Sequence, residues 1–300
     1  MSEFIVIALL GTAFGMVLFV SQSAVPEKGK KFSFGKLTVS QKASLLLLTI
    51  WLLCFLYSFA EPFDLEVNRI AFRSSKIAAG TGKLRLVHIS DLHCDGIRRT
   101  EDRIPGIVKN LNPDLILFTG DAANNKRGLP DFKAVMKSLS KIAPVFAVNG
   151  NHDSRGGRFF DQYGGTGVVK LNCRGTGLTV RDTSLYICGV DVDNETCLAE
   201  TLSMVPSEPF SIFLYHYPAG ADAAQKKEID LFLCGHTHGG QVRLPFYGAL
   251  FTNSTRGKAL EWGLYSRGKT RIHVSKGIGM TGLPIRFLAK PEIALIEISR

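Results

Sequence analysis

Residues 235–241, with the sequence GHTHGGQ, directly follow the apolar stretch 229–234, which predicts a buried strand. His236 and His238 stand at positions i and i+2, and on an extended segment such residues point to opposite faces. Glycine permits the backbone angles of a tight turn, so at a strand end both imidazoles can point into one cavity. Neutral imidazole is the commonest metal ligand. The stretch therefore indicates a metal site just past a strand, with a surface pair of histidines as the alternative.

Upstream of this stretch, short apolar segments alternate with segments of helical periodicity. Strands are expected over 84–90, 115–119 and 145–149, with helices over 100–110 and 131–142 between them. This β-α-β-α-β order, with strands that are apolar along their length, predicts a largely buried parallel sheet. The second half is richer in strands, which we expect over 168–171, 178–180, 185–190, 211–215, 229–234, 271–275 and 292–298, with one helix over 195–204.

Polar side chains cluster just past the ends of these strands, where open α/β sheets bind their ligands. In chain order they are Asp91, His93, Asp121, Asn151, His152, His216, His236 and His238. Carboxylate, amide and imidazole groups without cysteine suit Mn²⁺, Fe or Zn²⁺ better than Ca²⁺ or Mg²⁺. The set is too large for one ion and suits two ions about 3.5–4 Å apart with a carboxylate between them. Asp121, central in the order, is the candidate for that bridge.

Each of these motifs has a structural interpretation when it stands alone. Asp-x-His is more often a polar turn, Gly-Asp and Gly-Asn are common turn sequences, and an isolated His216 is usually structural. The metal interpretation gains weight because the motifs occur together, each after an apolar strand. His88 and His273 lie inside expected strands and are assigned to packing, and Cys94 and Cys234 are assigned to filling space.

The pattern D-x-H, G-D, G-N-H-D, H and G-H-x-H resembles that of calcineurin-like metallophosphoesterases, and the resemblance extends from about residue 84 to residue 300. The stretches GHTHGGQ and GLPIRFLAKPEIALIEI resemble the bacterial membrane-associated branch of that family, which includes UDP-2,3-diacylglucosamine pyrophosphatases and phosphodiesterases. The resemblance implies an α/β fold, a four-layer αββα sandwich around two mixed sheets. It also implies a hydrolase with two divalent metal ions, Mn²⁺ being expected first and Fe or Zn²⁺ being alternatives.

The resemblance also implies a role for each residue of the pattern. One metal ion would be held by Asp91, His93 and His238, and the second by Asn151, His216 and His236, with Asp121 shared. His152 would lie over the phosphate as leaving-group acid or charge stabiliser, and Asp153 would orient it. A hydroxide bridging the two metal ions would attack phosphorus.

Two segments, residues 4–20 and 43–60, contain no charged residue. As helices that rise about 1.5 Å per residue, each would span about 26 Å, close to the ~30 Å hydrocarbon core of a bilayer. We therefore expect two transmembrane helices in an anchor over 1–62, a linker over 63–81 and a metallophosphoesterase domain over 82–300. A cleaved signal peptide is the alternative for the first segment, which lacks the basic start of such peptides.

The loop between the two segments carries a cluster of lysines: Lys28, Lys30, Lys31, Lys36 and Lys42. The positive-inside rule then places the loop in the cytoplasm and the domain on the outer face of the inner or plasma membrane. Arg69, Arg73 and Lys76, which follow the second segment, argue for the opposite orientation. A surplus of cysteines, which suits a reducing cytoplasm, argues the same way.

The formal net charge of +10 suits an anionic partner such as a phosphate ester or an acidic membrane surface. Six cysteines without C-x-x-C spacing do not indicate a zinc ribbon or a disulfide framework, although a single bridge is compatible. Residues 277–290 are expected as a connecting loop or as a segment at the lipid headgroups beside the anchor. Basic residues in loops just past the motifs are candidates for contacting a substrate phosphate, with solvated surface charge as the default: Arg98, Arg99, Lys126, Arg127, Arg155 and Arg158.

Together these features predict a membrane-anchored, dinuclear-metal phosphohydrolase. Its substrate would contain a phosphodiester or pyrophosphate bond in an amphipathic, lipid-linked or nucleotide-linked molecule. A metal-dependent nuclease or general phosphodiesterase is the alternative enzyme, but no basic tract with interleaved aromatic residues indicates nucleic-acid binding. A catalytically inactive metal-binding membrane receptor is the non-enzymatic alternative, and the complete ligand set with His152 argues against it. No protein partner is indicated.

Overall fold

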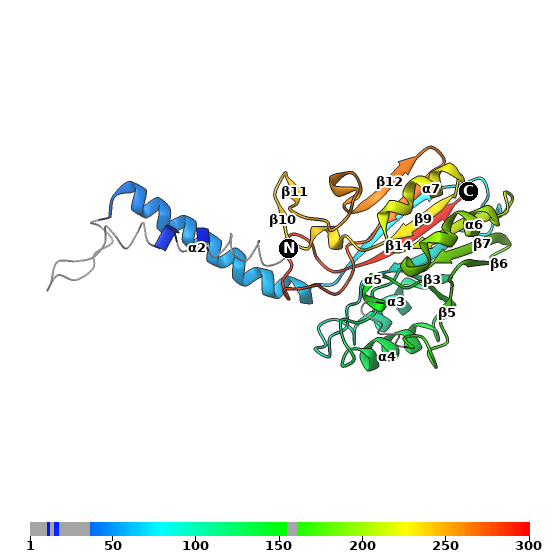
Figure 1. Cartoon of the computed structure of the whole chain (residues 1–300), viewed down its shortest axis with the longest axis horizontal. Coiled ribbons are helices and arrows are strands. Elements are labelled where there is room, and N and C mark those ends of the chain that lie inside the picture. The colour runs from blue at the N-terminus through cyan, green and yellow to red at the C-terminus, as the bar shows by residue number, and fades with distance from the viewer. Residues whose placement is uncertain (1–10, 13–14, 18–36, 155–160) are drawn as a thin grey trace.

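The computed structural model describes residues 11–12, 15–17, 37–154 and 161–300. A long helix, α2 (Val39–Ala60), extends from one end of a domain that contains two large β-sheets (Figure 1). Thr38 caps this helix, because its hydroxyl accepts a hydrogen bond from the backbone N–H of Gln41 at 3.3 Å. The Gln41 side chain accepts one from the Thr38 N–H at 2.8 Å in return. The α-helix ends where Pro62 lies in a 3₁₀ turn (Glu61–Phe63).

Helix α2 is apolar around its whole circumference. Of its 22 residues, all of them described, only Gln41 and Ser58 are buried. A helix that is apolar on all sides and not buried in protein has the character of a membrane span. With the turn that follows it (Val39–Phe63), it is the one helix among the described residues that is long and apolar enough to cross a membrane. Most of the first expected span, residues 4–20, lies outside the described residues, so a pair of transmembrane helices is not confirmed.

The first sheet has the strand order β1-β14-β2-β3-β4-β5. Its strands β14 and β2 are antiparallel, and all other neighbours are parallel. In sheet order the strands span Glu66–Arg73, Glu292–Ser299, Leu84–Ile89, Leu115–Phe118, Val145–Ala147 and Val169–Lys170.

The second sheet has the order β12-β13-β9-β8-β7-β6. Its outer pairs, β12 with β13 and β6 with β7, are antiparallel, and the inner neighbours are parallel. In sheet order the strands span Gly263–Arg267, Thr270–Val274, Leu231–Cys234, Phe210–Tyr215, Thr183–Val190 and Arg174–Val180. A separate two-stranded hairpin pairs β10 (Arg243–Leu244) with β11 (Gly248–Ala249).

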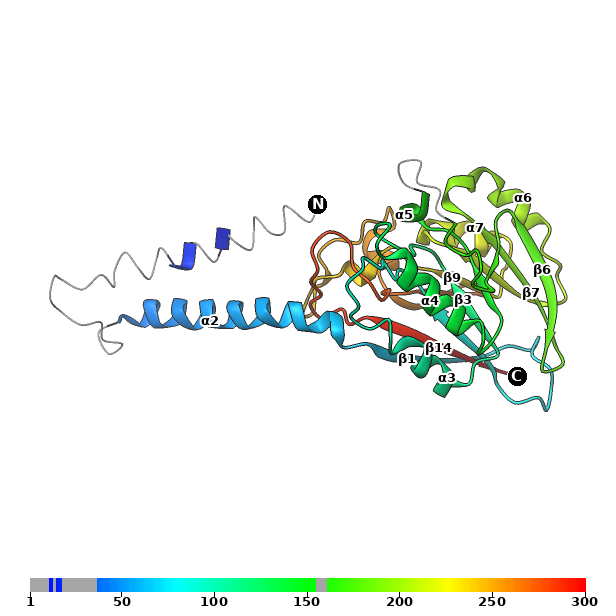
Figure 2. The same ribbon diagram turned by 90° about the horizontal axis from the view of Figure 1, so that it is seen from below.

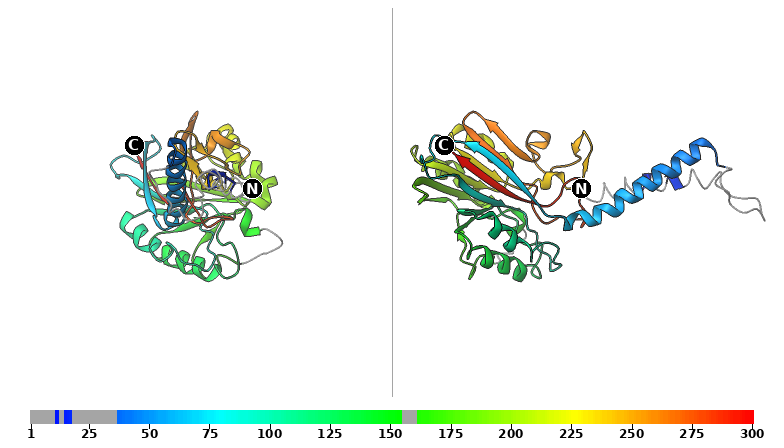
Figure 3. Two further views of the ribbon diagram at one scale, coloured as in Figure 1. Left: turned by 90° about the vertical axis from the view of Figure 1, so that its left-hand side faces the viewer. Right: turned by 180° about the vertical axis from the view of Figure 1, so that it is seen from behind.

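The two sheets pack face to face, and helices cover their outer faces (Figures 2 and 3). The side chains of β2 point alternately to its two faces. Leu84 and Leu86 lie in the core between the sheets. Val87 and Ile89 face the helices α3 (Ile104–Leu111) and α4 (Leu129–Leu139). On the other side, the outer face of the second sheet packs against α6 (Leu198–Ser203) and α7 (Ala221–Lys226). The predicted α/β fold with mixed sheets is confirmed.

The structure differs from the sequence-based expectation in the segment 63–81, which was expected to be a linker. Residues 66–73 form strand β1, which lies at the edge of the first sheet and pairs in parallel with the C-terminal strand β14. Half of the residues in its sequence, EVNRIAFR, are polar, which is compatible with an edge strand that buries few of its side chains. Ile70 is one that is buried, in the core between the sheets. The two-sheet domain therefore includes residues from strand β1 onward, so the segment 63–81 is not only a linker.

The position of β1 predicts different effects for two neighbouring substitutions. Ile70→Ala removes side-chain volume from the core between the sheets and should lower the free energy of unfolding by about 2–5 kcal/mol. Arg69→Ala, at an exposed position of the same strand, should change it by less than about 0.5 kcal/mol. Guanidinium unfolding of the full chain in detergent measures both values. Two equally small effects would mean that this segment does not contribute to the fold.

Candidate metal centre

The predicted ligands lie at the carboxyl ends of strands from both sheets. Asp91 and His93 follow β2, Asp121 follows β3, and Asn151 opens the short helix α5 (Asn151–Ser154) after β4. From the second sheet, β8 precedes His216, and β9 precedes His236 and His238. Because the parallel strands of both sheets end on one side of the sandwich, residues up to 147 positions apart in the chain (91 to 238) meet there.

Five of these residues have backbone angles in the left-handed region, which side chains other than glycine rarely adopt. The φ angles are +52° at Asp91, +44° at His93, +58° at Asp121, +70° at His236 and +53° at His238. Each such residue costs on the order of 1–3 kcal/mol, and strain of this kind is characteristic of functional sites. The strained backbone turns each side chain out of its strand and toward a common centre.

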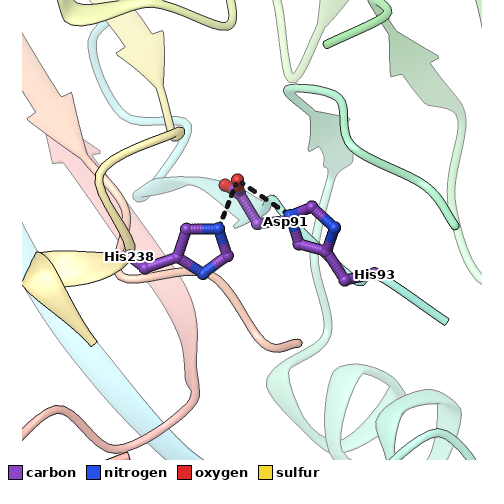
Figure 4. Close-up of side chains that lie close together, drawn as sticks. All are labelled: Asp91, His93 and His238. Carbon is purple, nitrogen blue, oxygen red and sulfur yellow. Dashed lines mark ion pairs between the residues drawn. The ribbon is translucent and has the colours of Figure 1, made fainter. Parts of the chain in front are cut away.

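The side chains form groups that share Asp91 and Asp121. His238 Nε2 lies 3.4 Å and His93 Nε2 3.7 Å from Asp91 Oδ1 (Figure 4). His93 Nε2 and His216 Nε2 each lie 3.3 Å from Asp121 Oδ2. One group consists of Asp91, His93 and His238 and another of Asp121, His216 and His236, and within each group one ligand atom per residue lies within 4.8 Å of the others.

Several buried polar atoms in this centre have no hydrogen-bond partner. They are His93 Nε2, Asn151 Oδ1, His216 Nε2 and His238 Nδ1. Buried polar atoms are normally satisfied, because leaving one without a partner costs about 1–3 kcal/mol. Nitrogen and oxygen lone pairs left free around two carboxylates suit divalent cations, so the residues present fit the metal ions that the sequence implies.

In His93 and His216, the ring nitrogen that faces away from the centre is held by an oxygen atom of the protein. His93 Nδ1 lies 2.7 Å from Asn124 Oδ1, and His216 Nδ1 lies 2.7 Å from the carbonyl oxygen of Thr119. These contacts fix each ring with its Nε2 toward the centre, as partners of metal-binding histidines do. Asn124 and Thr119 were not identified from the sequence. The only sequence signal for these two residues is that each is polar and lies within five positions of a candidate ligand at a strand end.

The electrostatic field of the centre favours positive charge. Burial favours the neutral acids, but the facing imidazoles hold the carboxyl pKa values of Asp91 and Asp121 below their usual range. Burial also opposes charge on His93 and His216, yet the carboxylates outweigh it and raise their pKa values to about 10 and about 9. In the metal-free protein, protons on these two rings compensate the buried carboxylates.

The other two histidines remain neutral in the same surroundings. Burial lowers the pKa of His236 to about 4 and that of His238 to about 3, and neighbouring charged imidazoles add to the effect. Neutral imidazoles can donate a lone pair to a cation without first losing a proton. His236 and His238 are therefore in the protonation state that metal binding needs.

The centre opens into a cavity of about 600 Å³. His152 and Asn151 line it, and so do Asp121, Tyr217, His236, Thr237, His238, Gly240, Gln241, Phe251, Asn253, Thr281 and Gly282. The half-buried ring of His152 stands edge-on to the His93 ring, with 4.8 Å between their centroids. Its backbone N–H donates to Asp121 Oδ1 at 2.8 Å. His152 thus lies at the boundary between the carboxylates and the space available to a substrate.

Asp153 occupies a different place from the one expected. It was expected to orient the ring of His152, but its carboxylate accepts hydrogen bonds from backbone N–H groups. Oδ1 accepts from Ala122, and Oδ2 accepts from Asp121 and Gly150, all at 2.7–2.8 Å. These bonds fix the left-handed turn at Asp121, so the structure makes Asp153 a support of that ligand.

His88 and His273, which were assigned to packing, form a buried polar link between the two sheets. Their Nδ1 atoms lie 2.8 Å apart, and His88 Nε2 lies 2.8 Å from Thr119 Oγ1. Because the carbonyl of the same Thr119 holds His216, this link supports a ligand from beneath the centre. Two histidines spaced far apart in the sequence gave no sign of this pairing.

Among the described residues, none of the basic residues proposed to contact phosphate lines the cavity. Arg98 pairs with Asp131 at 2.7 Å, and Arg99 pairs with Asp95 at 3.0 Å, so both guanidinium groups are engaged by carboxylates. Arg155 and Arg158 lie outside the described residues.

Comparisons with known proteins agree with this site. Residues 84–240 match the model of the calcineurin-like phosphoesterase family. The Bacillus subtilis protein named uncharacterized metallophosphoesterase YkuE is 34% identical over 259 residues, which cover 80% of this chain and 87% of the relative. Phosphodiesterase YaeI of Escherichia coli is 29% identical over 255 residues, 80% of this chain and 90% of its own.

A more distant relative is matched over a smaller share of its own length. The Danio rerio protein named transmembrane protein with metallophosphoesterase domain is 25% identical over 256 residues, 75% of this chain and 55% of its own. Both the family match and the Bacillus relative include the strand ends that carry the candidate ligands. The chain belongs to the calcineurin-like metallophosphoesterases and is a metal-dependent phosphoester hydrolase.

Proposed function

We propose that the protein is a membrane-anchored phosphohydrolase with two metal ions that cleaves a phosphodiester or pyrophosphate bond in an amphipathic, lipid-linked or nucleotide-linked substrate. The observation that carries the proposal is the clustering of Asp91, His93 and His238 in one ligand group and of Asp121, His216 and His236 in a second. Asp121 connects the two, because its Oδ2 also lies 3.3 Å from His93 Nε2 of the first group. The relative YaeI is named a phosphodiesterase, which favours a diester over a monoester as substrate.

In this proposal the first ion is held by Asp91, His93 and His238, and the second by Asn151, His216 and His236, with Asp121 between them. The groups of ligand atoms within 4.8 Å of one another, and the unpartnered buried atoms on four of these residues, support the assignment. Mn²⁺ is the proposed metal because the set mixes carboxylate, amide and imidazole ligands without a thiolate, and Fe or Zn²⁺ would be accepted by the same ligands. Such ions lower the pKa of water and neutralise phosphoryl oxygens.

His152 is proposed to provide the protein's own catalytic group. Its ring lines the cavity next to His93, and its backbone is held by Asp121. An imidazole at that edge can donate a proton to the leaving oxygen or stabilise charge that develops on it. Asp153 contributes indirectly, by holding the turn at Asp121.

The membrane anchor is proposed to consist of α2 and the uncharged segment 4–20. An apolar helix with almost no buried residue supports the first part, and the sequence alone supports the second. A tethered enzyme meets amphipathic substrates at a high effective concentration, which favours a lipid-linked substrate.

The catalytic domain is proposed to lie on the outer face of the membrane. The lysines between the two uncharged segments support this orientation through the positive-inside rule. A disulfide between Cys173 and Cys197 adds support, because disulfides persist in oxidising compartments and are rare in the cytosol. The remaining free cysteines of the domain, Cys94, Cys188 and Cys234, are buried and so are compatible with either face.

Substitution of the shared carboxylate should remove metal ions and activity together. In Asp121→Ala both proposed ions lose the ligand that they would share, so turnover of bis-p-nitrophenyl phosphate should fall by at least about 100-fold. Inductively coupled plasma mass spectrometry after supply of Mn²⁺ should detect less metal than in the wild type. The control is Asp102→Ala, at an exposed carboxylate, which should keep both properties. Full metal content in Asp121→Ala would contradict the ligand assignment.

Substitution of His152 should separate proton transfer from metal binding. His152→Ala should keep its metal content but lose about 10²–10⁴-fold in kcat for bis-p-nitrophenyl phosphate. The loss should be smaller for a substrate whose leaving group is more acidic, because such a group needs less protonation. Wild-type turnover by this variant would refute the catalytic role.

The proposed orientation predicts the redox state of one cysteine pair. When free thiols are alkylated in intact cells before lysis, non-reducing peptide mapping should find Cys173 joined to Cys197. Cys173→Ser should leave Cys197 free for alkylation. Alkylation of both residues in the wild-type protein would place the domain in the reducing cytoplasm.

A further inference from the structure

The β10–β11 hairpin carries an apolar tip at the end of the domain from which α2 extends (Figures 1 and 3). Leu244, Phe246 and Tyr247 are 44%, 111% and 60% exposed. Phe63 at the end of the anchor helix and Leu288 beside it are about half exposed as well. We call these five residues the anchor-side patch. Apolar side chains that gather on one surface usually mark an interaction site.

One residue connects this hairpin to the anchor. Phe287 accepts a hydrogen bond from the Arg243 N–H, and its own N–H donates to the carbonyl of Gln241, both at 2.9 Å. Its ring meets the ring of Tyr57 in α2 edge to face, with 6.1 Å between the centroids. The start of the hairpin therefore contacts the backbone of Phe287, and the last turn of α2 contacts its ring.

Further contacts fix the segment around Phe287 to the end of α2. The Arg286 N–H donates to the carbonyl of Ser58 at 2.9 Å. The buried carboxylate of Glu61 accepts from the N–H groups of Leu288 at 2.8 Å and Ala289 at 2.5 Å. Hydrogen bonds from two successive backbone N–H groups to one buried carboxylate leave little freedom of rotation. The domain is thus held in one orientation relative to α2, with the hairpin beside the helix.

The chemistry at the edge of the patch suits lipid headgroups. Lys258 Nζ lies 3.6 Å from the centre of the Tyr247 ring, and Lys290, which pairs with Asp64, lies near Tyr57 and the end of α2. Aromatic residues with lysines beside them are typical of segments that lie at a membrane interface, where the rings enter the headgroup region and the cations meet anionic lipids.

The hairpin also adjoins the metal-centre cavity. Gln241 and Phe251, which stand just before and just after the hairpin, both line that cavity. Any surface to which the hairpin binds therefore lies next to the opening of the cavity.

We propose that the anchor-side patch inserts into the interfacial layer of the bilayer that α2 crosses, so that the metal-centre cavity opens at the level of the lipid headgroups. This inference rests on the proposed membrane anchor. A lipid surface is the occupant because the patch continues the apolar surface of α2 at the point where the helix joins the domain. Substrates would enter from the headgroup layer without leaving the membrane.

The test places an environment-sensitive nitrobenzoxadiazole label at three positions of the full chain in vesicles of phosphatidylethanolamine and phosphatidylglycerol. The native Cys54 within α2 reports on the anchor. The variant Phe246→Cys, made together with Cys54→Ala, reports on the hairpin. Met204→Cys in the same background is the matched control, because this residue is exposed and apolar but lies beside α6 at the far end of the domain (Figure 2). The other free cysteines are buried and should not react.

Lipids with brominated acyl chains should quench the label at Cys54 and at residue 246 by about twofold or more, and leave the label at residue 204 unchanged. Quenching at Cys54 without quenching at residue 246 would overturn the hairpin proposal and leave the anchor intact. No quenching at Cys54 would overturn both. Energy transfer between copies labelled at residue 246, without lipid quenching, would assign the patch to a second copy of the chain and overturn the proposal. Turnover of bis-p-nitrophenyl phosphate by the labelled variants shows that they are folded, and it tests the hydrolase function independently of the membrane.

Discussion

Two buried carboxylates, Asp91 and Asp121, impose the constraint on which the rest of the structure depends. Isolated negative charges inside a protein are costly, so the surroundings must supply positive charge. His93 Nε2 and His216 Nε2, one from each sheet, lie 3.3 Å from Asp121 Oδ2, and the raised pKa values of these two rings let them carry the compensating protons in the absence of metal ions. Neither sheet alone carries all of the candidate ligands. The site therefore forms only where the strand ends of both sheets meet. The local backbone has adapted to the same demand, since a Cβ atom at Gly150 would lie 2.2 Å from an oxygen of Asp121.

The sequence was sufficient to predict the central strands and the candidate ligands that gather at their ends. The strands β2, β3, β8 and β9 are largely apolar because both of their faces are buried. This pattern can be recognised from the sequence alone. The candidate ligands could be proposed because each lies within four positions of the end of an apolar strand, either one of these four or β4. Strand β1 could not, because half of its residues are polar and do not alternate regularly with the apolar ones, so it resembles a linker when its partner is 226 residues away (66 to 292).

Contacts that depend on tertiary structure were not predictable either. The motif suggested that Asp153 acts on its neighbour His152, yet three backbone N–H groups converge on its carboxylate and decide its role. His88 and His273 lie in apolar strands, and only the stacking of the two sheets brings their nitrogens to 2.8 Å. In both cases the deciding partner comes from a distant element or from the main chain, and neither has a signature in local sequence.

The end of the anchor helix and the metal centre belong to one hydrogen-bonded unit. Arg286 is fully buried, and its guanidinium donates to the carbonyls of Lys276, Gly277, Gly279 and Ala289, which fixes the loop between β13 and β14. At one end this loop contacts Asp91, whose carbonyl accepts from the Gly279 N–H at 2.7 Å. At the other end it is bound by Glu61 at the end of α2. Because the desolvated guanidinium would be left unsatisfied if the loop moved, the loop behaves as a rigid connection. The position of α2 therefore determines the direction in which the metal centre faces.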